Sequence, residues 1–289
     1  MSGIVSLLPS ATEWIYALGL QGRLAAVTFE CDEPASARAD HRVVVSGLDT
    51  TGLTPGGIDA LVRATVTAGE PLYRLDEAAM AQIAPDLVLT QDLCRVCALP
   101  ADHVTAALDA VGCPTAVVTL DPHTLEQVLD AAVTVAAAAG VPSSGVALRA
   151  ALQQRLDAVQ RAEDGPRVLV LEWTDPPFVA GHWVPDLVAA AGGVPVLARP
   201  GERSVTTDWD AVSGAEVDIV LVAPCGYGLD DAAAQGRAVI ERLPATAQVW
   251  AIDAGGLVTR PGPRVVDAVE AIAALFEGAA MPGRTRQLR

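Results

Sequence analysis

The stretch of residues 124–162, TLEQVLDAAVTVAAAAGVPSSGVALRAALQQRLDAVQRA, separates two halves of the chain that follow the same plan. It predicts two helices. The first runs from residue 125 to Gly140, because glycine suits a left-handed helix end and Pro142 cannot continue the helix. The second starts after Ser144 and reaches about Ala162.

The second helix carries apolar residues three or four positions apart, as an amphipathic helix does. This stripe consists of Val146, Leu148, Leu152, Leu156 and Val159. About 19 residues at 1.5 Å each make a rod of roughly 28 Å, about the diameter of a small domain. We therefore expect a rod that joins two similar lobes, with the function between them. The predicted domains are residues 1–140, a connecting helix over 141–165, and residues 166–289.

Strands and helices alternate on both sides of this rod, which predicts an α/β fold with parallel sheets. The expected strands are residues 4–8, 23–28, 72–75, 86–90, 115–119, 167–171, 218–222 and 249–252. The expected helices are residues 11–18, 55–68, 77–83, 101–110, 186–191, 230–243 and 265–276. Ser10 and Glu13 form an expected capping box for the first helix. The basic tail from Gly278 is expected to be mobile.

Composition excludes several classes of function. A net charge of -16 repels phosphate backbones, so nucleic acid is not expected as a partner. No apolar run reaches the ~20 residues of a membrane helix. The N-terminus shows no secretory signal pattern, so we expect a cytoplasmic protein. All 19 cationic residues are arginine, which excludes chemistry that needs a lysine.

Unusual residues gather where the predicted strands end. In open α/β sheets, ligands bind beyond the carboxyl ends of the strands. Segments 84–89 and 215–221 match each other, and each precedes a loop with a thiol. The strand-end candidates for ligand contact or acid–base work are Glu30, Cys31, Asp32, Gln91, Asp92, Cys94, Glu172, Trp173, Cys225 and Tyr227. Among these, Cys31, Cys94 and Glu172 are the catalytic candidates.

The cysteines suggest a second use of the same loops. Cys94 and Cys97 form a C-x-x-C pair, which alone is half a zinc site or a redox pair. Joined by Cys31 and Cys225, or by His182, they would suit zinc or an iron–sulfur cluster. The alternative is small buried thiols.

Other side chains are candidates for holding a ligand. His182 would ligate a metal or act as an acid or base, or simply hydrogen-bond to its own loop. Trp173, Trp183 and Tyr227 would stack on a flat ligand or pack between lobes. Arg260, close to Arg264, would pair with a carboxylate of a ligand or lock the last helix.

Three segments resemble the cobalamin-binding branch of the ABC-transporter substrate-binding proteins: SLLPSATE (6–13), residues 181–193, and RPGPR (260–264). The resemblance implies two Rossmann-like lobes joined by one long helix, and it adds Ser10 to the ligand-binding candidates. Related proteins bind corrinoids, ferric siderophores, haem or metal ions. The cysteine loops are similar to those of a cytoplasmic subgroup.

The expected function is therefore binding of cobalamin or a similar small cofactor between the lobes. The alternative is a metal- or thiol-dependent enzyme on the same fold. An ABC permease is an expected partner only if an export signal has been removed.

Overall fold

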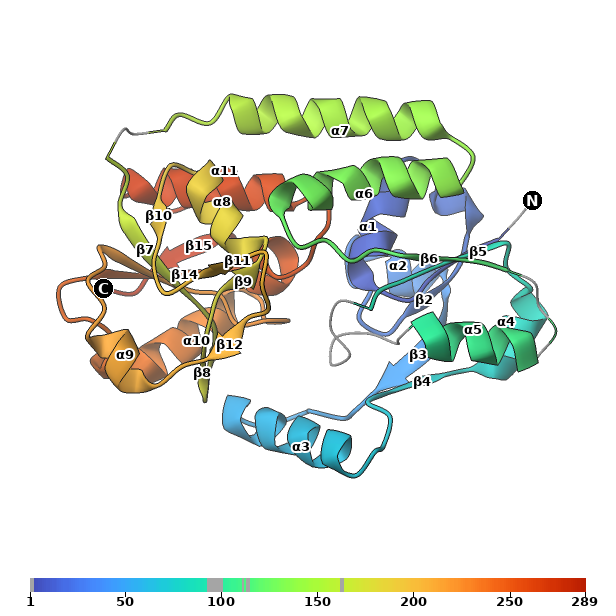
Figure 1. Cartoon of the computed structure of the whole chain (residues 1–289), viewed down its shortest axis with the longest axis horizontal. Coiled ribbons are helices and arrows are strands. Elements are labelled where there is room, and N and C mark those ends of the chain that lie inside the picture. Colours follow the sequence, from blue (N-terminus) through green and yellow to red (C-terminus); the bar gives the residue numbers. More distant parts are fainter. Residues whose placement is uncertain (1–2, 93–100, 111, 113–114, 162–163) are drawn as a thin grey trace. The chain divides into compact units, whose positions relative to one another are not determined.

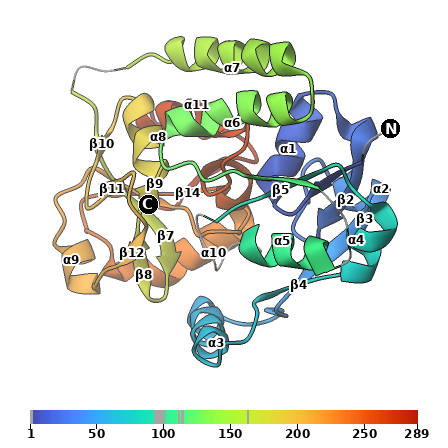
Figure 2. The same cartoon turned by 45° about the vertical axis from the view of Figure 1, so that its right-hand side comes forward.

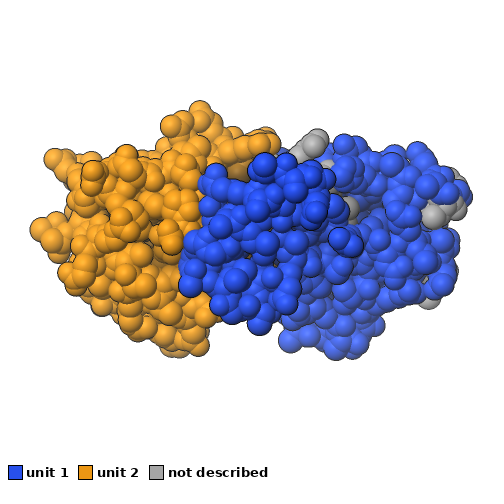
Figure 3. Space-filling view, turned by 90° about the horizontal axis from the view of Figure 1, so that it is seen from below, with its two compact units in different colours: residues 1–121, 129–150 blue, residues 122–128, 151–289 orange. Residues whose placement is uncertain are grey.

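A computed structural model describes all residues except 1–2, 93–100, 111, 113–114 and 162–163. The chain divides into two units (Figure 3). Unit 1 contains Met1–Asp121 and Leu129–Ala150, and unit 2 contains Pro122–Val128 and Ala151–Arg289. Each unit holds its own mainly parallel sheet.

The central stretch forms the two predicted helices, α6 (Leu125–Ala138) and α7 (Pro142–Asp157). Gly140 has the left-handed φ of +78° expected of the helix end. Helix α7 begins earlier than predicted, because proline is well suited to a first helical turn. Its apolar stripe is only partly buried: Leu152 and Leu156 are covered, but Val146 is 58% exposed. The division between the units passes through both helices, and the domain boundaries drawn from the sequence remain a prediction.

The sheet of unit 1 is parallel apart from one edge strand (Figure 1). Its order is β4 (Tyr73–Leu75), β3 (Arg42–Gly47), β2 (Leu24–Thr28), β1 (Ile4–Ser6), β5 (Leu87–Thr90) and β6 (Ala116–Thr119). Strand β4 is antiparallel to β3 and lies at the edge, as the sequence predicts. Strand β3 was not predicted.

Helices cover both faces of this sheet. The helices of unit 1 before the central stretch are α1 (Pro9–Ala17), α2 (Ala37–Asp40), α3 (Pro55–Thr67), α4 (Glu77–Ile83) and α5 (Ala101–Ala110), with a 3-10 turn, η1, at Gln21–Arg23. Because crossovers between parallel strands are right-handed, α1 and α5 lie on opposite faces. Met80 of α4 and Val104 of α5 pack on Val5 and Val88 of the sheet. Helix α3 stands away from the sheet in both cartoon views (Figures 1 and 2).

The expected capping box of α1 is wrong. The helix begins at Pro9 with Leu8 as its N-cap, and no side chain caps it. Proline at the first position fixes the backbone for helix entry, so Ser10 falls inside the first turn. Both Ser10 and Glu13 are buried there.

The sheet of unit 2 has a parallel centre with antiparallel edges. Its order is β12 (Val205–Thr206), β8 (Pro177–Val179), β7 (Arg167–Thr174), β13 (Ile219–Val222), β14 (Gln248–Ile252) and β15 (Thr285–Gln287). Strand β10 (Val194–Pro195) also runs parallel to β7, and β9 (Gly181–His182) pairs separately with β11 (Arg199–Pro200). Strand β7 is three residues longer than predicted, because β8 folds back on it as a hairpin.

Helices flank this sheet too, and the tail adds to it. They are α8 (Val184–Ala190), α9 (Trp209–Ser213), α10 (Leu229–Val239) and α11 (Val265–Phe276), with short turns η2 (Ile240–Arg242) and η3 (Ala254–Val258). The tail is not the mobile segment expected from its composition. Its strand β15 pairs with β14, and the Arg289 guanidinium donates hydrogen bonds to the carbonyls of Ile240, Pro244 and Ala247.

Both units share a central triplet of parallel strands, β1–β5–β6 in unit 1 and β7–β13–β14 in unit 2. The matching segments 84–89 and 215–221 lead into β5 and β13. In each unit the chain first adds strands on one side of the first triplet strand, β1 or β7, and then crosses to its other side to form the rest of the triplet. The carboxyl ends of β1 and β5, and of β7 and β13, are therefore the switch points where α/β folds bind ligands.

The α/β fold with parallel sheets is thus the predicted one. Within the part of the chain that is described, no helix combines the length and the apolar character needed to cross a membrane.

Candidate functional site

Two aromatic rings lie at the switch point of unit 2. Trp173 is near the end of β7, and Tyr227 follows β13. Their ring centroids are 5.7 Å apart with an angle of 47° between the planes, and both residues are half-buried. The Trp173 indole nitrogen donates to the carbonyl of Asp175 (3.0 Å), and the Tyr227 carbonyl accepts from Gly255 N–H (2.8 Å). The pair is thus fixed by the loops around it and leaves part of its aromatic surface open.

Glu172 precedes Trp173 and has its carboxyl group buried. The Ser204 hydroxyl donates to Oε2, and Gly181 N–H donates to Oε1 at 3.3 Å. Burial raises the pKa of Glu172 from its ordinary 4.5 to about 7, although these hydrogen bonds favour the charged form. The residue lies within β7, and not in a loop after it as predicted. A carboxyl group that titrates near neutral pH is chemically suited to acid–base work or to pairing with a polar ligand group.

His182 sits in β9 with an unusual backbone. Its φ is +49°, a conformation rare outside glycine. Its N–H donates to the Glu202 carbonyl at 2.5 Å, and its carbonyl accepts from Gly201 N–H at 3.0 Å. Burial lowers the pKa of His182, and the nearby His123 and Arg203 lower it further. The imidazole is therefore neutral at physiological pH.

His123 was not among the residues selected from the sequence, yet it lies beside His182. Their ring centroids are 5.8 Å apart. His123 lies just before α6, and the start of that helix is bound within unit 2: the Asp186 carboxylate accepts from Leu125 N–H at 2.9 Å. Asp186 therefore caps α6 from another helix. The signal in the sequence was the position of His123 in the short loop between a strand and a helix start.

The prediction that Trp183 stacks on a ligand is wrong. It is 5% exposed, and its indole nitrogen donates to the Val258 carbonyl at 2.8 Å. The ring is core of unit 2, because the helix that it precedes packs inward against α11. Arg260 is half-buried just after η3, and its predicted role stays a prediction.

The candidates after β5 in unit 1 are largely structural. Asp92 N–H donates to the Asp121 carboxylate at 2.5 Å, while the Asp92 carboxylate accepts from Ala101 N–H at 2.8 Å. Asp92 therefore holds the start of α5. Gln91 is buried, with 8% of its surface exposed.

The acidic residues beside Cys31 differ in exposure. Glu30 is half-buried and Asp32 is exposed, so both remain ligand-binding candidates of unit 1. Cys31 itself is fully buried, and its sulfur lies 3.0 Å from the Thr12 hydroxyl. That hydroxyl also bonds to Ser6 at 2.8 Å, so the thiol belongs to a polar chain inside the core. Neither a ligand nor a nucleophilic role suits a thiol in this position.

The predicted four-thiol site lacks support. Cys225 is exposed, whereas Cys94 and Cys97 lie outside the described residues. Among the residues that are described, no three histidine, cysteine, aspartate or glutamate side chains gather as a metal site would require. The zinc, iron–sulfur and thiol-enzyme interpretations therefore gain nothing from this part of the structure.

The buried position of Cys31 leads to a test. Cys31→Ala is expected to lower the free energy of unfolding by about 1 kcal/mol, because it opens a small void and removes a partner of Thr12. Metal and ligand binding should not change. Chemical unfolding followed by circular dichroism measures the effect, with Cys225→Ala as the exposed control. Unchanged stability combined with lost metal binding would contradict the core assignment.

A second aromatic pair, also missed by sequence reasoning, lies in unit 1. Phe29 follows β2, and Tyr73 begins the antiparallel β4 beside the end of β3. Their ring centroids are 6.3 Å apart. A side chain at Gly47 would lie 2.5 Å from the Phe29 ring, so this glycine makes room for it. Phe29 and Tyr73 thus occupy the carboxyl edge of their sheet, as Trp173 and Tyr227 do in unit 2.

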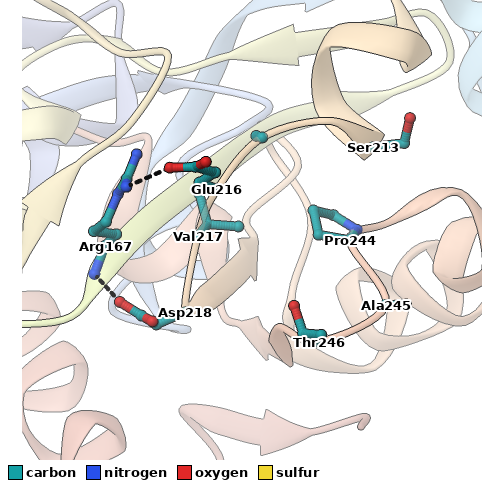
Figure 4. A pocket seen from close by; sticks show the side chains of 9 residues that line it. Arg167, Ser213, Glu216, Val217, Asp218, Pro244, Ala245 and Thr246 are labelled. Atoms are coloured by element: carbon teal, nitrogen blue, oxygen red, sulfur yellow. Dashed lines mark hydrogen bonds and ion pairs between the residues drawn. The ribbon is translucent and has the colours of Figure 1, made fainter.

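A cavity of about 350 Å³ lies elsewhere in unit 2 (Figure 4). It is lined by residues at the amino ends of β7, β13 and β14. There Arg167 binds the carboxylate of Glu216 at 3.1 Å through its guanidinium, and that of Asp218 at 2.7 Å through its backbone N–H. Because ligands of α/β sheets bind at the opposite edge, we assign this hollow no functional role.

Two α/β units, each with candidate binding groups at the carboxyl edge of its sheet, are the arrangement of a ligand-binding protein of α/β class. The chain belongs to the periplasmic binding protein family, whose model matches residues 4–261.

Solved structures agree on the fold. The vitamin B12 binding protein BtuF of Vibrio cholerae is 22% identical, with a TM-score of 0.68 and 96% of each chain covered. The haem-binding protein RhuT from Roseiflexus sp. RS-1 is 23% identical, with a TM-score of 0.69, and covers 97% of this chain and 99% of its own. A haem-binding protein from Pseudomonas aeruginosa is 19% identical, with a TM-score of 0.71, and covers 100% and 95%. A comparison with curated protein sequences finds no match.

Proposed function

We propose that this protein binds a small cofactor-like ligand with a flat ring, a corrinoid of the cobalamin kind, at the carboxyl edge of the sheet in unit 2. The observation that carries the proposal is the Trp173–Tyr227 pair, which is half-buried and held by loops after three neighbouring strands. Similar structures are named for binding vitamin B12 or haem, which supports the same ligand class.

Charge favours a corrinoid over haem. Haem carries two propionate groups, which a protein with a net charge of -16 repels. The amide side chains of cobalamin carry no charge and form hydrogen bonds. A flat ring also gains from contact with the open aromatic surface of Trp173 and Tyr227.

The proposal predicts a tryptophan-specific loss of affinity. Trp173→Ala should weaken cobalamin binding about tenfold, or about 1.4 kcal/mol, because the ligand loses its contact with the large apolar face of the indole ring. Trp209→Ala is the matched control: Trp209 is also half-buried in unit 2, but its ring contacts Arg242 at 4.2 Å, away from the switch point. Calorimetric titration with cobalamin and with haem measures both variants. Equal affinities in the two variants, or no corrinoid binding by the wild type, would refute the proposal.

We also propose that the protein works in the cytoplasm. The chain has five cysteines, an odd number, which does not suit the framework of paired disulfides common in exported proteins. Fractionation of cells that express the natural gene tests this. Recovery in an exported fraction would contradict it and would make an ABC permease the expected recipient of the ligand.

A further inference from the structure

His182 carries an unsatisfied nitrogen. Its Nε2 is buried and has no hydrogen-bond partner among the described residues. No other buried side-chain nitrogen or oxygen among those residues is in this situation. Leaving a buried polar atom unpaired costs about 1–3 kcal/mol. The residue also keeps a left-handed backbone, with φ of +49°. An unpaired buried nitrogen and an unfavourable backbone conformation in one residue indicate that a partner binds there.

A second imidazole is available beside it. The ring centroids of His123 and His182 are 5.8 Å apart, and the planes are inclined by 52°. His123 Nδ1 lies 3.0 Å from the Gly201 carbonyl, so this nitrogen carries the proton and donates. In the neutral ring, Nε2 of His123 then holds a free lone pair. The hydrogen bond from Nδ1 to a backbone carbonyl is also how metal-binding histidines are commonly oriented.

The turn at Gly201 binds both the ring of His123 and the backbone of His182. Gly201 offers its carbonyl to His123 and its N–H to the carbonyl of His182. Gly181, before His182, is packed against the backbone of Ser204, where a side chain would not fit. The His123 ring and the His182 backbone are therefore held by the same part of unit 2.

We propose that His123 and His182 form a two-histidine site for a divalent transition-metal ion such as zinc, cobalt, nickel or copper. Imidazole is a preferred ligand of these ions, whereas magnesium and calcium select oxygen. No third histidine, cysteine or carboxylate joins the pair among the described residues, so water or a bound small molecule fills the other positions. Affinity should be highest for copper among the divalent ions, since the protein supplies only nitrogen ligands and no selective geometry. This inference does not depend on the proposed corrinoid.

Nitrogen NMR of the imidazole rings tests the site on the full, untagged chain. The chain has four histidines, at positions 41, 103, 123 and 182, so each ring gives a separate signal. Titration with zinc chloride, continued over several equivalents, should shift the Nε2 signals of His123 and His182 together along one binding curve. His103, exposed on α5, and His41, bonded to Tyr16, should stay unchanged. Zinc taken up first by cysteines would delay the shifts but not change which rings respond.

Variants separate a shared site from two independent ones. His182→Ala and His123→Ala should each weaken zinc binding at this site at least tenfold, and each should abolish the shift of the other ring. His103→Ala is the matched control and should bind as the wild type does. If His123 and His182 respond at different zinc concentrations, if all four rings respond alike, or if none responds up to millimolar zinc, the shared site is refuted. Circular dichroism confirms that each variant is folded.

Discussion

Gly181→Ala is expected to lower the free energy of unfolding by about 3 kcal/mol, a cost typical of severe overpacking. A methyl group at this position would lie 2.3 Å from Ser204 N, 2.6 Å from the Arg203 carbonyl carbon and 2.6 Å from the Glu202 oxygen. All three atoms belong to the backbone, so no side-chain rotation relieves the overlap. The backbone of Gly181 does not have a positive φ, so the cost comes from space alone.

The damage should extend to the candidate site. Strand β9 pairs with β11 through Gly181 and His182, and Gly181 N–H donates to the Glu172 carboxylate. Moving residues 202–204 away would break these contacts and free the His182 ring. We therefore expect weaker zinc and corrinoid binding in addition to the loss of stability.

Urea unfolding of Gly181→Ala and of a matched glycine variant measures the effect. Gly22→Ala is the control, because a methyl group there meets no atom within 4 Å and the backbone φ is not positive. The control should stay within about 0.5 kcal/mol of the wild type. Hydrogen exchange should show faster exchange at residues 181–205 in Gly181→Ala alone. If both variants unfold like the wild type, the close packing around β9 is not as described.

Helices were predicted well where local signals define their ends. Helices α4 and α11 have the boundaries expected from the sequence. The side chain of Asp76 caps α4. The start of α11 is marked by the prolines of segment 260–264. Strands β8, β9, β11 and β12 were missed because each has only two or three residues, too few for an alternating pattern. Strand β15 was missed because its pairing with β14 is a long-range contact that composition does not encode.

The site was predictable only in part, for a related reason. Strand ends pointed to Trp173 and Tyr227, which do meet. Trp183 was misjudged because sequence does not show which side of a helix start faces the core. His123 was missed because its partner, His182, lies in β9, a two-residue strand that was not predicted, and Phe29 because its partner, Tyr73, lies in the antiparallel edge strand β4. Pairing of that kind depends on the tertiary fold.

Glu172→Gln is expected to remove most of the pH dependence of stability between pH 5 and pH 8. The pKa of Glu172 is about 7 in the folded protein and near 4.5 when the chain is unfolded. Between these values the folded state keeps a proton that the unfolded state has released. The stability of the wild type therefore falls as pH rises through this window and levels off above pH 7.

The size of the effect follows from the width of the window. At about 1.4 kcal/mol for each pKa unit, the wild type should lose about 3 kcal/mol across it. Glutamine has nearly the shape of the protonated carboxyl group. Its amide oxygen can accept from Gly181 N–H, and its NH₂ group can donate to Ser204. The variant should thus match the wild type near pH 5 and be more stable at pH 8.

Unfolding in urea at several pH values between 5 and 8 measures this difference. Glu216→Gln is the matched control, because that carboxylate is 86% exposed in the same unit and pairs only at the surface with Arg167. The control should follow the wild-type pH curve. Parallel curves for the wild type and Glu172→Gln would mean that Glu172 is ionised throughout this range. Its carboxylate would then be stabilised by Ser204 and Gly181 more than burial destabilises it, and it would bind a cationic ligand group at neutral pH.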